Sequence, residues 1–256
     1  MILSRLSQAI RHQNWFAVAI EFIVVVSGVV IGFAVTGWAE DRNERQRAAQ
    51  YIERLAADME ENESRYLRSR AFRSDVRLFG LEALSYASGE TEPADPWRVV
   101  LAYFNAGQAG GSQLVTATYN ELIATGELRL LPQSGLRAQL SSYYSQQILT
   151  RITDELPDFR KSVRGIIPIV LQDYIWANCY ETTNGRDQAF LECEAPDVMA
   201  AAMPGLAEQL ITDDALTAEL RYWVSTQFAA LALYNARIAL TRSMLLDLQA
   251  EQTSSP

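Results

Sequence analysis

The longest apolar stretch of the chain runs from Trp15 to Trp38. It reads WFAVAIEFIVVVSGVVIGFAVTGW and carries one charged residue, Glu21. A helix rises about 1.5 Å per residue, so a helix of this length spans roughly 35 Å, enough to cross the hydrocarbon core of a bilayer. Tryptophan at each end is typical of a helix whose ends lie at the level of the lipid headgroups. The pattern predicts a transmembrane helix over residues 15–38.

A cleaved signal peptide is the alternative interpretation of this stretch. Gly37-Trp38-Ala39 loosely resembles a small-residue cleavage site. The apolar stretch is longer than the hydrophobic region of an ordinary signal peptide, which favours a retained span. The preceding residues 1–14 predict a short interfacial segment on the cytoplasmic face, because their apolar residues fall on one side of a helix: Ile2, Leu3, Leu6 and Ile10.

An acidic residue inside the span requires an explanation. An ionisable group in hydrocarbon costs about 2.5 kcal/mol or more unless it finds a partner or reaches the interface. On a helix, four residues fall within about 40° of one another: Glu21, Val25, Gly28 and Gly32. A carboxyl beside a small-xxx-small pair predicts a face that docks a second transmembrane helix. The alternative is that Glu21 reaches the interface and the glycines have no special role.

Two further long segments, 39–79 and 213–250, contain neither glycine nor proline. Both repeat apolar residues at the three-and-four spacing of a helix that buries one stripe. In the first segment the stripe is Ile52, Leu55, Met59 and Tyr66. In the second it is Leu216, Leu220, Trp223, Leu231, Tyr234, Ile238, Leu245 and Leu248. We expect these two helices to pack against each other in antiparallel orientation.

Glycine, proline and polar clusters divide the middle of the chain into shorter helices. Asp95-Pro96 is typical of an N-cap followed by proline at the first helical position, and Ser134 predicts another cap. Pro157 predicts a fresh start or a kink, and Pro168 predicts a kink in the next helix. No segment alternates like a strand between turn signals, so we expect almost no sheet.

The fold class predicted by these patterns is all-α. One N-terminal transmembrane helix continues into a long helix, which packs with further helices as an elongated bundle. Residues 39–256 form a helical extramembrane domain, and the chain crosses the membrane once.

Composition excludes several classes of function. A net charge of −9 argues against nucleic-acid binding, which requires a basic surface. The sequence contains one histidine, His12, which argues against a histidine-based catalytic triad and excludes a zinc site built on several histidines. We therefore expect no catalytic residues, no metal site and no cofactor.

The side of the membrane on which the domain lies is open to two interpretations. Arginines are fewer before the span (Arg5, Arg11) than just after it (Arg42, Arg45, Arg47, Arg54), which favours a cytoplasmic domain. Long domains translocate largely regardless of charge, and Cys179 and Cys193 could form a disulfide in an oxidising compartment. We expect a periplasmic domain with this bridge. The alternative is a pair of inert thiols in the cytosol.

Several aromatic residues of the middle and last helices are candidates for a ligand pocket, because helical bundles bind ligands between helices. They are Tyr119, Tyr143, Tyr144, Trp176, Tyr222 and Trp223. Aromatic residues at helical spacing more often form the core, and that interpretation is favoured.

Two segments resemble a family of uncharacterised bacterial single-span inner-membrane proteins. The first, IEFIVVVSGVVIGFAVTGWAEDRNERQRAAQYIERLAADMEEN (20–62), is similar to that family's acid-bearing span, terminal tryptophan and long charged helix. The second, TATYNELIATGELRLLPQSGLRAQLSSYY (116–144), is similar to its Tyr-x-x-Leu-x-x-x-Gly block followed by paired tyrosines. The matching residues are Tyr119, Leu122, Gly126, Tyr143 and Tyr144. The resemblance implies a single-pass topology in a bacterial inner membrane and implies no active site.

Three hypotheses of function follow. The leading one is a non-enzymatic, membrane-anchored scaffold or accessory protein, whose partners are the lipid bilayer and either a second copy of the chain or another membrane protein. The second is a ligand-binding helical domain similar to the sensor domains of membrane receptors. The third is a membrane-bound enzyme that uses carboxylates and tyrosines with shifted pKa values, and no pattern in the sequence requires it.

Overall fold

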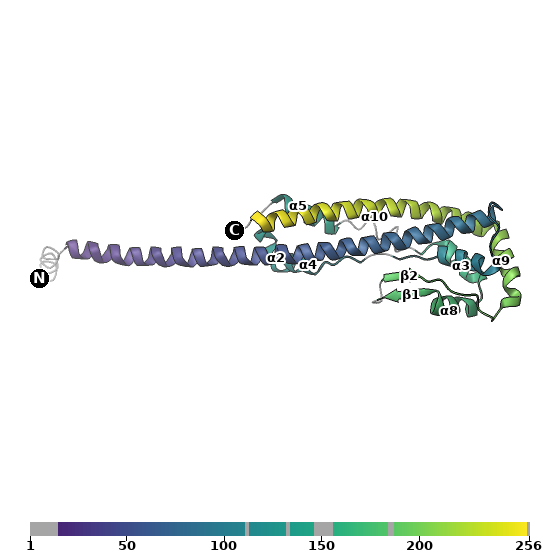
Figure 1. Ribbon diagram of the computed structural model, residues 1–256. Helices are drawn as coiled ribbons and strands as arrows, with labels where there is room; N and C mark the ends of the chain where they lie inside the picture. The colour runs from purple at the N-terminus through teal and green to yellow at the C-terminus, as the bar shows by residue number, and fades with distance from the viewer. Residues whose placement is uncertain (1–14, 111–112, 132–133, 146–155, 184–186, 255–256) are drawn as a thin grey trace, which may run out of the picture. The chain divides into compact units, whose positions relative to one another are not determined.

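The fold is mostly α-helical, with one short β-hairpin (Figure 1). The computed structural model describes residues 15–110, 113–131, 134–145, 156–183 and 187–254. The predicted interfacial segment 1–14 lies outside the described residues. The chain divides into two compact units, Met1–Tyr51 and Ile52–Pro256.

Helix α2 (Trp15–Ala87) contains both the predicted transmembrane helix and the predicted helix 39–79 without a break. The absence of glycine and proline from 39–79 explains why no break occurs there. In the second unit, the predicted stripe of this helix is buried. Ile52, Leu55, Met59 and Tyr66 are each at most 2% exposed.

Helix α10 (Asp214–Ser254) is the predicted C-terminal helix. The Asp213 carboxylate accepts a hydrogen bond from the Leu216 amide at 2.9 Å and so caps its first turn. Within the second unit, α10 lies beside α2 (Figure 1). Their contacts run in antiparallel order, because residue numbers fall along α10 as they rise along α2. The pairs are Glu63 with Arg242, Tyr66 with Tyr234, and Arg73 with Gln227.

The main core of the second unit surrounds α3 (Pro96–Ala106). Asp95 accepts a hydrogen bond from the Arg98 amide at 2.8 Å, which confirms the predicted N-cap and proline start. Every α3 residue after Arg98 is buried, as expected of a helix that is apolar on all sides. The helix packs against α7 (Asp158–Ile166) and α9 (Met203–Thr212).

Shorter elements complete the second unit. They are α4 (Ala117–Thr125), η1 (Glu127–Leu130), α5 (Ser134–Ser145), α8 (Ile169–Asn178) and η2 (Ala200–Ala202). Helix α5 packs against α10, and Ser134, which the sequence predicted as the N-cap, is its first residue.

The two prolines of the 157–168 region both precede helices. Pro157 comes directly before α7, which confirms the predicted fresh start. The predicted kink at Pro168 is wrong, because α7 ends at Ile166 and α8 begins at Ile169. A residue before proline is pushed out of the α region, and Ile167 is extended, with φ −74° and ψ 122°.

The cysteine loop contains a hairpin that the sequence patterns did not predict. Strands β1 (Tyr180–Thr183) and β2 (Asp187–Phe190) pair antiparallel, with Tyr180 opposite Phe190 and Thr183 opposite Asp187. Each strand has four residues whose burial does not alternate, so both lack the pattern from which strands are recognised. The expectation of almost no sheet holds for the described residues, with this one local element as the exception.

Candidate functional site

The predicted partner-binding face, made of Glu21, Val25, Gly28 and Gly32, lies on the surface of the first unit and is called the Glu21 face below. Val25 keeps 60% of its surface exposed, and Glu21 is exposed as well. A Cβ atom added at Gly28 or Gly32 would meet no atom within 4 Å. The Thr36 hydroxyl donates to the Gly32 carbonyl at 3.0 Å, within the helix. The face therefore leaves room for the close approach of another helix.

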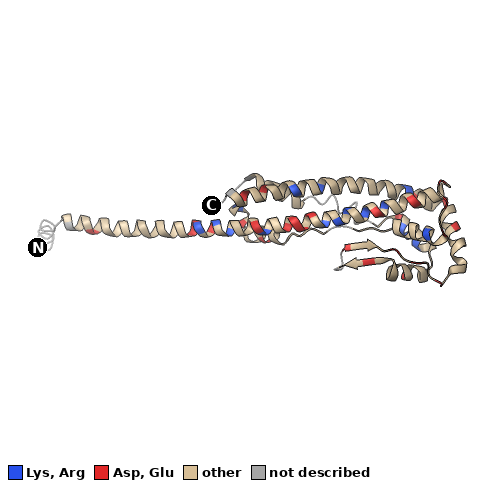
Figure 2. Ribbon diagram, viewed as in Figure 1, with Lys and Arg blue, Asp and Glu red and all other residues tan. Residues whose placement is uncertain are grey.

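The same part of α2 exposes large apolar side chains on all sides. Phe16, Phe22, Phe33 and Trp38 are between 63% and 75% exposed. The mean hydropathy of its most apolar 18-residue window is 2.6, and none of that window is buried. By length and composition, this helix is a candidate membrane span. Charged residues are sparse in this part of α2 and frequent after it (Figure 2).

Cys179 and Cys193 lie at disulfide distance, with their Cα atoms 5.2 Å apart. Cys179 directly follows α8 and is fully buried. Its carbonyl accepts a hydrogen bond from the Leu191 amide at 2.9 Å, just beyond β2. The cysteine pair therefore closes the base of the hairpin, next to the end of α8.

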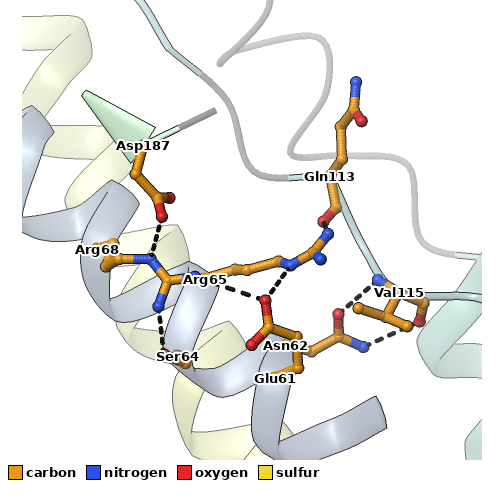
Figure 3. A network of polar contacts seen from close by, with 8 residues as sticks. All are labelled: Glu61, Asn62, Ser64, Arg65, Arg68, Gln113, Val115 and Asp187. Carbon is orange, nitrogen blue, oxygen red and sulfur yellow. Dashed lines mark hydrogen bonds and ion pairs between the residues drawn. The ribbon is translucent and has the colours of Figure 1, made fainter. Parts of the chain in front are cut away.

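The hairpin contacts α2 through aromatic ring pairs and through a charged pair. The rings of Phe72 and Phe190 stack with their centroids 4.9 Å apart. The guanidinium of Arg68 lies 3.0 Å from the carboxylate of Asp187 (Figure 3). Residues of α2 and the hairpin also line a cavity of about 350 Å³. The hairpin is thus held on α2 by both aromatic contacts and an ion pair.

A second set of polar contacts joins α2 to the segment before α4 (Figure 3). The Asn62 amide accepts from the Val115 backbone amide at 2.7 Å and donates to the Val115 carbonyl at 3.2 Å. Arg65 donates to Glu61 at 2.7 Å and to the Gln113 carbonyl at 2.8 Å. Asn62 is fully buried, so its side chain replaces hydrogen bonds that this backbone would otherwise make with water.

Three residues of the predicted ligand pocket come together where α4 and α5 meet. The rings of Tyr119 and Tyr144 stack at 4.4 Å, and Tyr143 meets Tyr144 edge-on at 5.0 Å. The Tyr143 hydroxyl lies 3.1 Å from the Thr241 hydroxyl of α10. Burial raises the pKa of both Tyr143 and Tyr144. These rings pack against one another and against α10.

The block Tyr-x-x-Leu-x-x-x-Gly corresponds to helix α4 and the glycine that follows it. Tyr119 and Leu122 are three residues apart on α4, and Leu122 is fully buried. Gly126 follows the end of α4 with φ 70°, the left-handed conformation that favours glycine. The block therefore encodes one helix, its packing residues and its C-terminal glycine.

The two tryptophans of the predicted pocket lie in other parts of the second unit. Trp176 on α8 meets Phe104 at 5.5 Å and Tyr180 at 4.6 Å between ring centroids. Trp223 on α10 is 4% exposed and donates from its indole nitrogen to the Ala106 carbonyl at 2.7 Å. The structure therefore separates both tryptophans from the tyrosine group.

A cavity of about 600 Å³ lies between α7 and α10. Two predicted pocket residues, Tyr222 and Trp223, line it, together with Phe159 from α7. The carboxylates of Asp158 and Glu219 also line this cavity. It combines aromatic walls with charge, which is how small-molecule sites are commonly built.

Two buried arginines are polar features that the sequence patterns did not predict. Arg73 is 1% exposed and donates to the Gln227 side chain and to the Gly110 carbonyl, both at 2.9 Å. Arg237 is 7% exposed and lies over the Tyr143 ring at 4.4 Å from its centroid. The spacing could have indicated that Arg73 is buried, because it follows the buried Tyr66 by seven residues, which places both on the same stripe of the helix.

Among the described ranges, no three His, Cys, Asp or Glu side chains are placed to hold a metal ion. Comparisons of the chain with protein-family models, with curated proteins and with solved structures give no match.

Proposed function

We propose that this protein is a non-enzymatic helical scaffold or accessory protein, anchored in a bacterial inner membrane by one span at residues 15–38. The observation that carries the proposal is the exposed apolar surface of α2 between Phe16 and Trp38. Contiguous apolar surface of this size is unfavourable in water and stable in hydrocarbon. The resemblance to the single-span bacterial family supports the same topology.

The Glu21 face supports an assembly role. A carboxyl group in the hydrocarbon region is stabilised by pairing with a polar group of another helix. Gly28 and Gly32 allow such a helix to approach closely, since the space above both is empty. The partner that we propose is a second copy of this chain or another membrane protein. Nucleic acid is not proposed, because the chain carries a net charge of −9.

The cysteine pair supports a periplasmic location for the rest of the chain. A disulfide persists in the oxidising periplasm and is rare in the cytosol. We also infer that the helices of the second unit form an elongated bundle, which is supported by the antiparallel contacts between α2 and α10.

The test is capture of the full-length protein from native membranes in a gentle detergent. We expect Glu21→Leu and Gly28→Leu to release a copurifying partner or to shift the oligomeric state, because each alters the docking face. Mass spectrometry of the same sample should find Cys179 and Cys193 bridged.

Gly37→Leu is the matched control. This glycine lies on the same helix, about 160° around its axis from Glu21, and a Cβ there meets no atom within 4 Å. It should leave the assembly unchanged. An assembly state that is identical in all three variants would contradict the docking role, and reduced cysteines would contradict the periplasmic location.

The second candidate function is ligand binding by the helical domain. The observation that favours it is the cavity between α7 and α10, which Trp223 lines. Its volume of about 600 Å³ lies within the range of about 300–1,000 Å³ that is typical of ligand pockets.

A further inference from the structure

We propose that the cavity between α7 and α10 binds a small organic ammonium ion. The proposal names the ligand class for the second candidate function, on which it rests, and it is independent of the membrane-anchored scaffold role. It is drawn from the shape of the cavity, from the charges that line it, and from its aromatic walls.

The wall contributed by α10 is a regular helical face. Glu219, Tyr222, Trp223 and Thr226 line the cavity, and the last three lie three, four and seven residues beyond the first. That spacing places all of them on one side of the helix. The Thr226 hydroxyl donates to the Tyr222 carbonyl at 3.1 Å, so its hydrogen bond is made within α10. The opposite wall comes from α7 and includes Asp158, Phe159 and Lys161.

The charges on these walls do not balance. The Lys161 ammonium lies 3.1 Å from the Asp158 carboxylate, so these two neutralise each other. The side chain of Glu219 makes no ion pair with any residue that the structure describes. One of its oxygens, Oε2, is buried and accepts no hydrogen bond within the described part of the chain. A carboxylate in this situation is stabilised by a cation or a hydrogen-bond donor.

The aromatic walls favour an organic cation over a hydrated metal ion. Tyr222 is 77% exposed, an unusual state for a large aromatic side chain, and it stands at the rim of the cavity. Phe159 and Trp223 are buried, so each adds only a small patch of apolar surface to the wall. An ammonium group beside aromatic rings is attracted by their negative faces, and its hydrocarbon part gains from contact with the same rings. An anion would be repelled by Glu219.

The test is isothermal titration of the full chain in detergent with two ammonium probes, choline and benzylamine. Each has a neutral counterpart of similar shape, 3,3-dimethylbutan-1-ol for choline and benzyl alcohol for benzylamine. Ionic strength is held constant with sodium chloride, because salt screens exposed charges. We expect saturable binding of at least one ammonium probe and about tenfold weaker binding of its neutral counterpart.

Variants locate the binding. Glu219→Gln keeps the shape of the side chain and should weaken ammonium binding by about tenfold or more. Tyr222→Ala should weaken it several-fold, and because this ring is mostly exposed the fold is preserved. Asp247→Asn is the matched control, because it removes one negative charge from an exposed position elsewhere on α10.

The outcomes separate clearly. Binding that is lost in Glu219→Gln and kept in Asp247→Asn supports the proposal. Three results would overturn it: no saturable binding of either ammonium probe, equal binding of the neutral counterparts, or undiminished binding in Glu219→Gln. None of these results bears on the assembly assay of the Glu21 face, so failure of this site and failure of the scaffold role are distinguishable.

Discussion

Gly80 of α2 lies directly against Val224 of α10, so that a Cβ atom at Gly80 would collide with Val224 Cγ2. Leu220 Cδ1 lies 3.6 Å from the same point. The two helices therefore approach each other here at a distance that only glycine permits. The contact fixes how α2 and α10 pack at the end of the second unit where the main core lies.

Replacing Gly80 with alanine should destabilise the protein. Alanine gains about 1 kcal/mol of helix propensity over glycine, but overpacking against Val224 costs about 1–3 kcal/mol. Gly165→Ala on α7 is the control, because a Cβ there meets nothing within 4 Å. Chemical denaturation of the full chain should show Gly80→Ala to be less stable than Gly165→Ala. Equal stability of the two variants would contradict the prediction, because it would mean that α2 and α10 make room for the added methyl group without losing stability.

The buried arginine of α2 should contribute more to stability than its neighbour Arg70. Arg73→Met leaves the Gly110 carbonyl and the Gln227 amide without their donor, which should cost about 2–3 kcal/mol. Arg70 donates to Asn235 at 3.1 Å in a solvent-exposed contact, so Arg70→Met should cost less than about 1 kcal/mol. The denaturant midpoints of the two variants, measured under the same conditions, test this difference in stability. Similar losses would show that burial of Arg73 adds nothing.

Reducing the cysteine pair should lower stability. A bridge between Cys179 and Cys193, which are separated by 14 positions, should stabilise the fold by about 3 kcal/mol, because it restricts the unfolded chain. Thermal unfolding should therefore shift to lower temperature when a reductant is added. The Cys179→Ala/Cys193→Ala double variant should be less stable at the outset and insensitive to reductant. A wild-type melting temperature that is the same with and without reductant would show that the bridge does not form.

Alkaline pH should destabilise the second unit. Burial raises the pKa of Tyr103 and Tyr180 to about 12, and burial together with a hydrogen bond to Glu82 raises that of Tyr86 to about 12. In the unfolded chain these hydroxyls ionise near the ordinary tyrosine pKa of about 10. The stability that these three groups contribute is therefore fully present below about pH 10 and is lost as pH rises from about 10 towards 12.

Titration followed by circular dichroism and by tyrosinate absorbance tests this dependence. Helix content should fall together with a cooperative rise in absorbance. Tyr180→Phe should make the loss of stability less steep, whereas Tyr222→Phe should not, because Tyr222 is largely exposed. Gradual ionisation of all tyrosines near pH 10, with the helices intact, would contradict the prediction.

Local patterns were enough to predict the long helices and their buried stripes. The three-and-four spacing of Leu55 and Met59 depends only on the geometry of one helix, as does the cap at Asp95. Pro168 marks a full break rather than a kink, because it also forces Ile167 out of the helical region. The hairpin has one sequence signal, the Asn184-Gly185 pair between the two strand sequences, which is typical of hairpin turns.

By itself, the sequence determined a mostly α-helical chain with one apolar helix long enough to span a bilayer, because periodicity, capping and hydropathy act over a few turns of one element. Only the tertiary structure decided which faces meet. It paired Arg73 with Gln227 across 154 positions, separated Trp176 from Tyr143, and brought Phe159 of α7 and Glu219 of α10 to the walls of one cavity. These contacts join distant parts of the chain, and spacing along one helix does not specify which other helix will cover it.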